Sequence, residues 1–245
     1  MLEGLRAAAT GMTAQQQRMD ALSNDIANVN TTAYKHERTS FRDLVASPTG
    51  LGGAEQVGAG AGAAAKSAGR GWGQGGLQAT EQPLDVAIQG DGFLQVKLAD
   101  GRTALTRSGS LHVDARGRVA TSEGSLLQPP VTLPVGTSPS DVQIASDGTV
   151  SAQGRPIGRM VLVSVTSPHK LDDASAGVYT TNAASGPPRA AGGDTTLAQG
   201  ALEASNVDLG DAMVELMAAQ RGFQMASQAV RSQDEMLSIA NGLKQ

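Results

Sequence analysis

The chain contains no cysteine and very few aromatic residues. Its 245 residues include one Trp, two Tyr and three Phe. The absence of cysteine excludes disulfide cross-links and thiolate metal sites. Aromatic rings contribute much of the area buried in compact cores, so this small number argues against one large globular core. We therefore expect a modest β-domain together with extended parts.

The sequence also lacks the charge pattern and the apolar runs that mark several classes of protein. It has 19 Lys and Arg against 23 Asp and Glu, a formal net charge of −4 and no basic stripe, which gives nucleic-acid binding little support. No run of about 18 apolar residues is present, so we expect no membrane insertion. The opening MLEGLRAAATGMTAQQQ is too weakly apolar for a secretory signal peptide.

Residue patterns that would support catalysis or metal binding are scarce. The three histidines, His36, His112 and His169, stand apart from one another and show no metal-ligand spacing. Carboxylates are scattered, and no Ser lies in a nucleophile-elbow pattern. GAGAAAKS at 60–67 nearly matches a phosphate-binding loop, but Ala65 replaces the second Gly, and no buried strand or helix is predicted beside it. We expect no enzyme activity, no cofactor and no metal.

Both ends of the chain carry an apolar repeat with a period of seven residues. The N-terminal repeat consists of Leu5, Met12, Met19 and Ile26, with Ala8, Gln15, Leu22 and Val29 three residues further on. The C-terminal repeat consists of Leu209, Leu216, Phe223, Val230 and Leu237, with Ala212, Ala219, Ala226, Gln233 and Ala240 three residues further on. These patterns predict helices over 5–29 and 209–243 that pair as a coiled coil.

Two interpretations of these helices are open. Each apolar stripe could pack on a globular core, as most amphipathic helices do. The strict period, the position at both termini and the β-like middle favour helices that pack on each other or on helices of neighbouring subunits. The large apolar members of the two repeats are then the expected assembly interface. Gly4, Gly11, Gly210 and Gly222 each cost about 1 kcal/mol relative to Ala, so the helices are expected to be weak in isolation.

The middle of the chain divides into a glycine-rich stretch and a β-rich stretch. Residues 50–76 contain eleven Gly, which predicts an extended connector or a flexible loop. Trp72 within it is either an anchor for another surface or a stacking residue of the β-domain. Beyond Leu77, short apolar runs alternate with turn signals, including a hairpin over 111–119 and strands at 160–165 and 178–180.

These patterns together predict an α+β fold. A terminal-helix domain is expected over 1–45 and 200–245, an extended Gly-rich connector over 46–80 and an all-β outer domain over 81–199.

Both ends of the chain resemble the bacterial flagellar rod and hook proteins. The N-terminal stretch LSNDIANVNTTAYKHERTSFRDL is similar to a family signature and matches it at Ala27, Asn28, Thr31, Tyr34, Lys35, Phe41, Asp43 and Leu44. The C-terminal stretch matches at Leu202, Glu203, Ser205, Asn206, Val207, Gln220, Arg221, Phe223, Asp234 and Met236. The segment QGGLQATEQPLDVAIQGDGFLQV is similar to the β-domain of distal rod proteins. Ala33 stands where the family usually has Gly, and Ala226 and Gln228 replace Asn and Lys.

The resemblance implies a structural subunit of the distal rod of the flagellar basal body, with a proximal rod or hook-type axial protein as the alternative. It implies export through the flagellar type III apparatus and helical stacking of copies into a hollow shaft that transmits torque. It also implies contacts with proximal rod and hook proteins, and with surrounding rings. If the backbone at position 33 needs a positive φ, Ala33 carries a penalty there.

Overall fold

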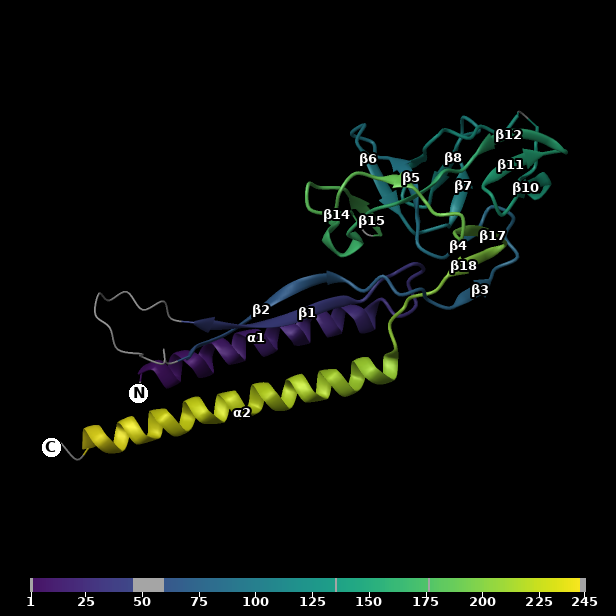
Figure 1. The fold of residues 1–245 in the computed structure, drawn as a ribbon. Helices are drawn as coiled ribbons and strands as arrows, with labels where there is room; N and C mark the ends of the chain where they lie inside the picture. Colours follow the sequence, from purple (N-terminus) through teal and green to yellow (C-terminus); the bar gives the residue numbers. More distant parts are fainter. Residues whose placement is uncertain (1, 46–59, 135, 176, 243–245) are drawn as a thin grey trace. The chain divides into compact units, whose positions relative to one another are not determined.

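A computed structural model describes residues 2–45, 60–134, 136–175 and 177–242. The chain forms two compact units, each made of segments that are distant in the sequence. A helical unit comprises Met1–Ala27, Glu37–Ala68 and Asp208–Gln245, and a β unit comprises Asn28–His36 and Gly69–Val207. The predicted α+β class is confirmed, because a helix at each end of the chain flanks a β-rich middle (Figure 1).

The helical unit contains two long helices that run antiparallel. Helix α1 spans Leu2–Ala27 and helix α2 spans Leu209–Gly242. Gly222 of α2 packs against the Gln15 side chain and Gly4 of α1 packs against the Gln233 side chain. These two contacts fix the register, because a side chain at either glycine would occupy the space that the glutamine fills. The helices therefore pack on each other, as expected, while their coiled-coil geometry stays a prediction.

The alanine column of α2 lies on the side of the helix that packs against α1. Ala219 and Ala212 are buried, with exposed fractions of 1% and 7%. Small side chains at a contact permit a short distance between helix axes. Between Ala212 and Ala219 in the sequence of α2, Glu215 pairs with Arg18 of α1, with Oε2 and Nη2 3.0 Å apart.

Helix α1 ends two residues earlier than the heptad pattern predicted. A turn begins at Asn28, whose carbonyl accepts the backbone N–H of Thr31 at 3.0 Å. The Thr31 hydroxyl donates to Asn28 Oδ1 at 3.1 Å, which gives this segment an alternative to helical hydrogen bonding. Val29 was predicted to be on the helix, but it lies beyond the last helical residue and belongs to the β unit.

A two-stranded sheet covers one side of α1. Strand β1 spans Glu37–Val45 and pairs with β2, which spans Gly60–Arg70. At Gly62 the strand approaches Thr10 of α1 so closely that a Cβ would overlap the threonine side chain, and the Thr10 hydroxyl accepts the N–H of Ala63 at 3.3 Å. Part of the predicted connector over 46–80 is therefore a paired strand of the helical unit. Residues 71–80 belong to the β unit, and residues 46–59 lie outside the described residues.

The β unit is built from short antiparallel strands. Its largest sheet has the order β14-β15-β6-β5-β9-β8-β7, with β13 joined to β5 and β16. The strands of this sheet are β5 (Phe93–Lys97), β6 (Thr103–Thr106), β7 (Leu111–Val113), β8 (Val119–Thr121), β9 (Leu126–Leu127), β13 (Leu162–Ser164), β14 (Asp172–Ser175), β15 (Val178–Thr180) and β16 (Arg189–Ala190). The predicted hairpin over 111–119 is confirmed as β7 and β8, in which Val113 pairs with Val119.

Smaller sheets complete the β unit. They contain β10 (Val142–Ile144), β11 (Thr149–Ala152) and β12 (Arg155–Arg159); β4 (Val86–Gln89) with β17 (Thr196–Gln199); and β3 (Leu77–Ala79) with β18 (Ala201–Glu203). Two single 3-10 turns lie at Pro139–Asp141 and Pro168–Lys170. The core is formed by aliphatic side chains from most of these strands, including Val86, Ile88, Leu94, Val96 and Leu127. Aliphatic packing thus replaces the missing aromatic rings.

Two helix glycines give a test of the helix pairing. A Cβ added at Gly11 meets nothing within 4 Å, so Gly11→Ala should raise the free energy of unfolding by about 0.5–1 kcal/mol. Gly222→Ala should give less, because its Cβ would lie 3.1 Å from the Gln15 side chain. Urea unfolding of the full chain, followed by circular dichroism, measures both. Equal gains would mean that Gln15 does not pack on Gly222.

Candidate functional site: a buried ionic junction and an exposed helix face

The predicted assembly residues of the two helices differ in their exposure. Leu22 is buried, and Leu209 is exposed at 41%. The half-buried members are Leu5, Met12, Met19, Ile26, Leu216, Phe223 and Val230, with Val29 half-buried beyond the helix end. The side chain of Leu237 lies outside the described residues. Because the helices already pack on each other, part of the predicted interface is used within the chain, and its role between subunits stays a prediction.

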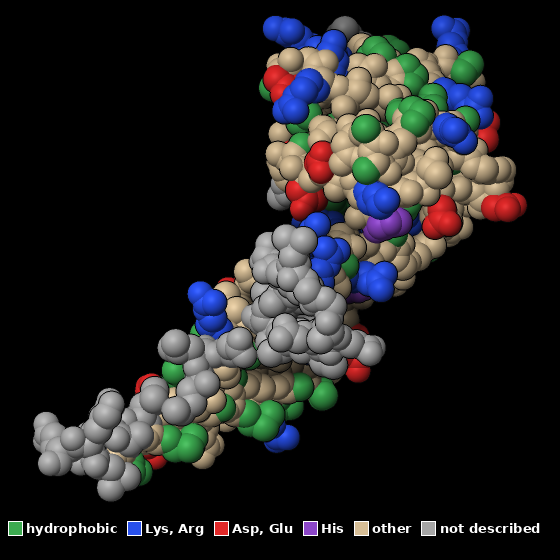
Figure 2. All heavy atoms as spheres, turned by 60° about the vertical axis from the view of Figure 1, so that its left-hand side comes forward, with side chains coloured by type: hydrophobic (Ala, Val, Ile, Leu, Met, Phe, Trp, Pro, Cys, Tyr) green, Lys and Arg blue, Asp and Glu red, His purple; other side chains and the backbone are tan. Residues whose placement is uncertain are grey.

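A second apolar stripe lies on the outer face of α2 and was missed by the sequence analysis. Its residues are 48–67% exposed, and they are Met213, Val214, Met217, Met225, Met236 and Ile239. Figure 2 shows hydrophobic side chains on the surface of the helical unit. The spacing of Met213, Met217 and Met225 by multiples of four was the signal that could have revealed this stripe. The sequence analysis considered only the heptad repeat of α2 that packs on the partner helix, and the apolar residues outside that repeat were overlooked.

Two residues of the family signature also lie on the outer face of α2. Gln220 and Arg221 are both exposed. Arg221 stands four residues from Met217 and four from Met225, so it lies within the apolar stripe. Methionine and arginine are enriched in protein–protein interfaces, and this face has that composition.

The β unit contains a buried carboxylate that is paired with two cations. Glu203 has an exposed fraction of 2%, Arg107 of 3% and Lys35 of 0%. The Lys35 ammonium donates to Glu203 Oε1 at 2.6 Å and to the Gly73 carbonyl at 2.8 Å. Arg107 Nε donates to Glu203 Oε2 at 2.8 Å. The second Arg107 donor, Nη2, reaches the Gly90 carbonyl at 2.9 Å, so all three charged groups have hydrogen-bond partners.

Backbone groups extend this cluster to neighbouring segments. The N–H of Gly75 donates to Glu203 Oε1 at 2.9 Å, and the N–H of Ala33 donates to the Glu203 carbonyl at 2.8 Å. Ala33 has a φ of 57°, so the position that resembles a family glycine does require the left-handed conformation. An Ala there costs about 1–2 kcal/mol relative to an ordinary conformation.

Asn206 joins the same segments a few residues later. Its side-chain oxygen accepts the N–H of His36 at 2.8 Å, and its amide nitrogen donates to the carbonyls of Gly71 at 2.7 Å and Gly73 at 3.0 Å. Its own N–H donates to the Tyr34 carbonyl at 3.2 Å. We call Lys35, Arg107, Glu203 and Asn206, with the backbone of residues 71–75, the Glu203 junction.

The charges of the junction shift one another's pKa. Burial raises the pKa of Glu203, but the Lys35 hydrogen bond and the Arg107 charge outweigh burial and hold this pKa below its ordinary value. Burial lowers the pKa of Lys35, and Glu203 only partly offsets this effect. The two cations and one carboxylate leave a net positive charge in the buried cluster.

Glycines near the junction are required by close contacts. A Cβ at Gly71 would overlap the His36 ring, and one at Gly75 would overlap the Ala204 carbonyl oxygen. Gly73 and Gly76 have nothing within 4 Å of an added Cβ. These contacts lie in residues 69–76, which the β unit includes, while the extended connector or flexible loop over 50–76 stays a prediction. Several of its glycines allow backbone segments to approach each other.

Trp72 belongs to an aromatic cluster of the β unit. Its ring packs edge-to-face on Phe93 and Tyr179, with centroid distances of 4.8 and 4.9 Å. Arg70 lies 5.6 Å from the Tyr34 ring and 5.7 Å from the Tyr179 ring, and it pairs with Asp173 at 2.7 Å. Of the two interpretations of Trp72, the structure supports stacking within the β-domain and not an anchor awaiting another chain.

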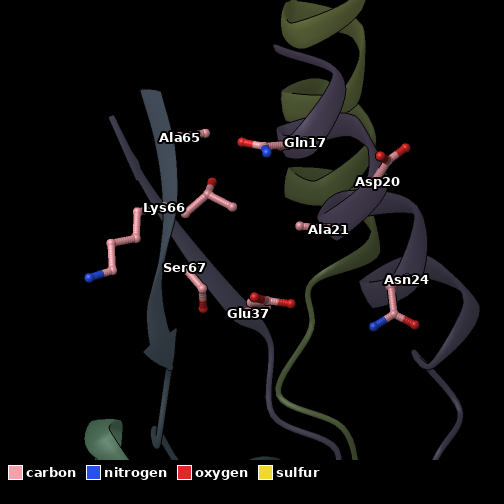
Figure 3. Close-up of a pocket in the computed structure, with 9 residues that line it drawn as sticks. Gln17, Asp20, Ala21, Asn24, Glu37, Ala65, Lys66 and Ser67 are labelled. Atoms are coloured by element: carbon pink, nitrogen blue, oxygen red, sulfur yellow. The ribbon is translucent and has the colours of Figure 1, made fainter. Parts of the chain in front are cut away.

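The near-match to a phosphate-binding loop lies in strand β2. Ala65, Lys66 and Ser67 line one side of an open groove of about 400 Å³ beside α1 (Figure 3). Lys66 extends away from the helix, whereas Gln17 and Glu37 point into the space between helix and strands. A phosphate-binding loop needs a helix directly after it, and β2 continues as a strand to Arg70. Residues 60–67 therefore do not form a phosphate-binding loop.

The described part of the chain has no group of three or more His, Asp or Glu residues that could hold a metal ion. Neither of its two long helices combines the length and the apolar character that a membrane crossing requires.

Three family models match separate parts of the chain. They are described as flagella basal body rod protein, flagellar hook protein FlgE/F/G D1 domain and flagellar basal body rod FlgEFG protein C-terminal, and they match residues 5–35, 87–152 and 198–243. The flagellar basal-body rod protein FlgG of Borreliella burgdorferi is 35% identical over 263 residues, covering 100% of this chain and 99% of that protein. The chain belongs to the flagellar basal-body rod protein family.

Other relatives in this family support the assignment. FlgG of Bacillus subtilis is 35% identical over 265 residues, which cover 100% of both chains. FlgF of Escherichia coli is 30% identical over 249 residues, which cover 96% of this chain and 94% of FlgF. The chain is thus a structural rod protein of the flagellar basal body, nearer to the FlgG type of the distal rod than to FlgF.

The three charged residues of the Glu203 junction come from the three matched segments of this rod protein. Lys35 lies in the first, Arg107 in the second and Glu203 in the third. Lys35, Glu203 and Asn206 match the family signature in the sequence, and the structure brings all three to the junction. Arg107 was missed, because nothing in its local sequence distinguishes it from a surface arginine.

The neighbouring glycines of the junction give a matched test. Gly75→Ala should lower the free energy of unfolding by several kcal/mol, because the added methyl overlaps the Ala204 carbonyl. Gly76→Ala should change it by less than about 0.5 kcal/mol, the usual effect at an uncrowded surface site. Denaturant unfolding followed by Trp72 emission separates the two. If both variants lose similar amounts of unfolding free energy, the close contact at Gly75 is not the reason that glycine is needed there.

The junction should make stability depend on pH. The folded pKa of Glu203 is lowered, so its stabilising contribution is complete above the ordinary glutamate pKa of about 4.3 and is lost as the pH falls through the folded value. Glu203→Gln should cost about 3–5 kcal/mol at pH 7, since it leaves buried cations without their anion. The difference in free energy of unfolding between Glu203→Gln and the wild type should be smaller at pH 3 than at pH 7.

The exposed Glu81→Gln serves as the control for this pH experiment. It should match the wild type at both pH values. A constant difference between wild type and Glu203→Gln from pH 7 to pH 3 would contradict an ionised Glu203 in the folded chain.

Proposed function

We propose that the chain polymerises with copies of itself into the distal rod, a hollow helical shaft that transmits torque from the motor to the hook. The observation that carries this proposal is the apolar stripe on α2, whose six large side chains are 48–67% exposed. A stripe of this kind on a helix marks a surface that another protein covers. Helical polymers form when two different patches of one chain meet in a contact that does not close into a ring.

The rod's neighbours follow from the same proposal. The chain contacts proximal rod and hook proteins at the ends of its own segment, with surrounding ring proteins as a further contact. The flagellar type III export apparatus delivers it to the periplasmic side of the inner membrane. A role in the proximal rod or as a hook-type axial protein is the second candidate, which the full-length likeness to FlgF of Escherichia coli supports.

We also propose that the chain has no enzymatic role, no cofactor and no nucleic-acid partner. The family of structural rod proteins supports this proposal. Two carboxylates of the β unit, Glu203 and Asp173, serve in ion pairs that join its segments.

A single charge on the outer face of α2 tests the function. Met225 is 67% exposed, so Met225→Glu should leave the free subunit folded. In a rod, that carboxylate would be buried without a partner at a cost of several kcal/mol, and assembly should fail. Cells that carry only this variant should make the protein but lack a distal rod and motility, as judged by electron microscopy of basal bodies and by swimming.

The same position supplies the matched control. Met225→Leu keeps an apolar side chain of similar size, and exchanges of this kind cost little at a packed contact. Met225→Leu should support normal rods and swimming. Normal motility of the Met225→Glu strain would show that this stripe does not face another subunit.

A further inference from the structure

The β unit receives the chain through several connections. The chain passes between the helical unit and the β unit after Ala27, His36, Ala68 and Val207. These crossings mean that three segments of the β unit, 28–36, 69–76 and 201–207, adjoin the connections. Any load that reaches the β unit along the chain enters it through these segments.

The Glu203 junction ties these three segments to one another. Lys35 and the N–H of Ala33 bind Glu203, and His36 binds Asn206, which holds the first segment to the third. The N–H of Gly75 also binds Glu203.

The first and second segments are joined directly as well. The N–H of Gly71 donates to the His36 carbonyl at 3.0 Å, and Arg70 donates to the Lys35 carbonyl at 2.9 Å. Every one of the three segments is therefore bonded to the other two.

We infer that the Glu203 junction is a mechanical joint, which distributes load among the connections of the β unit and prevents any one segment from being pulled out alone. The inference rests on the proposed role of the chain in a torque-transmitting shaft. It assigns to Lys35, Glu203 and Asn206 a role in keeping geometry under force that is separate from assembly.

The chemistry of the junction suits that role better than it suits stability. Burying charges costs desolvation energy, and buried ion pairs often stabilise a protein no more than an apolar group of the same size. Apolar contacts have no preferred direction, whereas a hydrogen bond weakens steeply when its angle changes. A segment held by hydrogen bonds to a buried charge cannot slide without leaving that charge unpaired.

A substitution of Lys35 can distinguish a role in resisting load from a role in thermodynamic stability. Arg107 alone balances the charge of Glu203, so the Lys35 ammonium is a second cation in a buried site. Removing it leaves a neutral pair and removes a net positive charge. What is lost is the side-chain tie between residues 28–36 and the rest of the junction.

The test applies force to the full chain outside the rod. The chain has no cysteine, so Ser40→Cys and Arg116→Cys, both at exposed positions, provide attachment points in the helical unit and the β unit. Lys35→Met in this background should keep its denaturation midpoint, while the β unit should open about tenfold faster at a given force, which corresponds to about 1.4 kcal/mol. Lys66→Met, at an exposed lysine, should match the parent chain in both measurements.

Other outcomes would overturn the inference. Equal opening rates with and without Lys35 would show that the junction does not resist load. A Lys35→Met chain that fails to fold, or whose equilibrium stability falls in step with its resistance, would make Lys35 an ordinary stability residue. The measurement needs no rod, so its failure is distinct from failure of the proposed function, which the Met225→Glu strain tests.

Discussion

The arrangement of the β unit depends on one carboxylate that is almost inaccessible to water. Glu203 accepts hydrogen bonds from Lys35, Arg107 and Gly75, and its carbonyl accepts one from Ala33. These partners come from parts of the chain that share no secondary structure element. Without the carboxylate, two cations would be buried together with no anion, so the segments cannot keep their places independently. Gly75 and the strained Ala33 backbone donate directly to Glu203, and Arg70 donates to the carbonyl of its partner Lys35.

The two helices pack on each other within the chain, and α2 also presents an apolar face for the proposed contact with a neighbouring subunit. The small alanine column of α2 lies against α1, and the glutamines at 15 and 233 occupy the space above opposing glycines. That use of the inner face leaves methionine, valine and isoleucine side chains on the outer face. Methionine is unbranched and polarisable, so it can adapt to a neighbouring surface of irregular shape. The helical unit thus combines a fixed internal register with an adaptable outer surface.

Local sequence patterns predicted the helices and the hairpin, but they could not predict contacts between segments that are distant in the sequence. The heptads located both helices, and turn residues located the β7–β8 hairpin. The Lys35–Glu203 pair joins positions 168 residues apart, and no local periodicity carries that information. The glycine content of residues 69–76 predicted an extended connector or a flexible loop. Glycine also permits close packing of backbone segments, and only the neighbouring atoms distinguish close packing from flexibility.

The separation of Lys35 from Glu203 also sets the order of events in folding. A chain that emerges with its N-terminus first presents α1 and Lys35 long before their partners, α2 and Glu203, are available. Closing so long a loop is slow, because its entropy cost is incurred before any contact compensates for it. The partners of α1 and Lys35 lie in the last fifth of the sequence. The N-terminal segment therefore stays without its partners until nearly the whole chain has emerged.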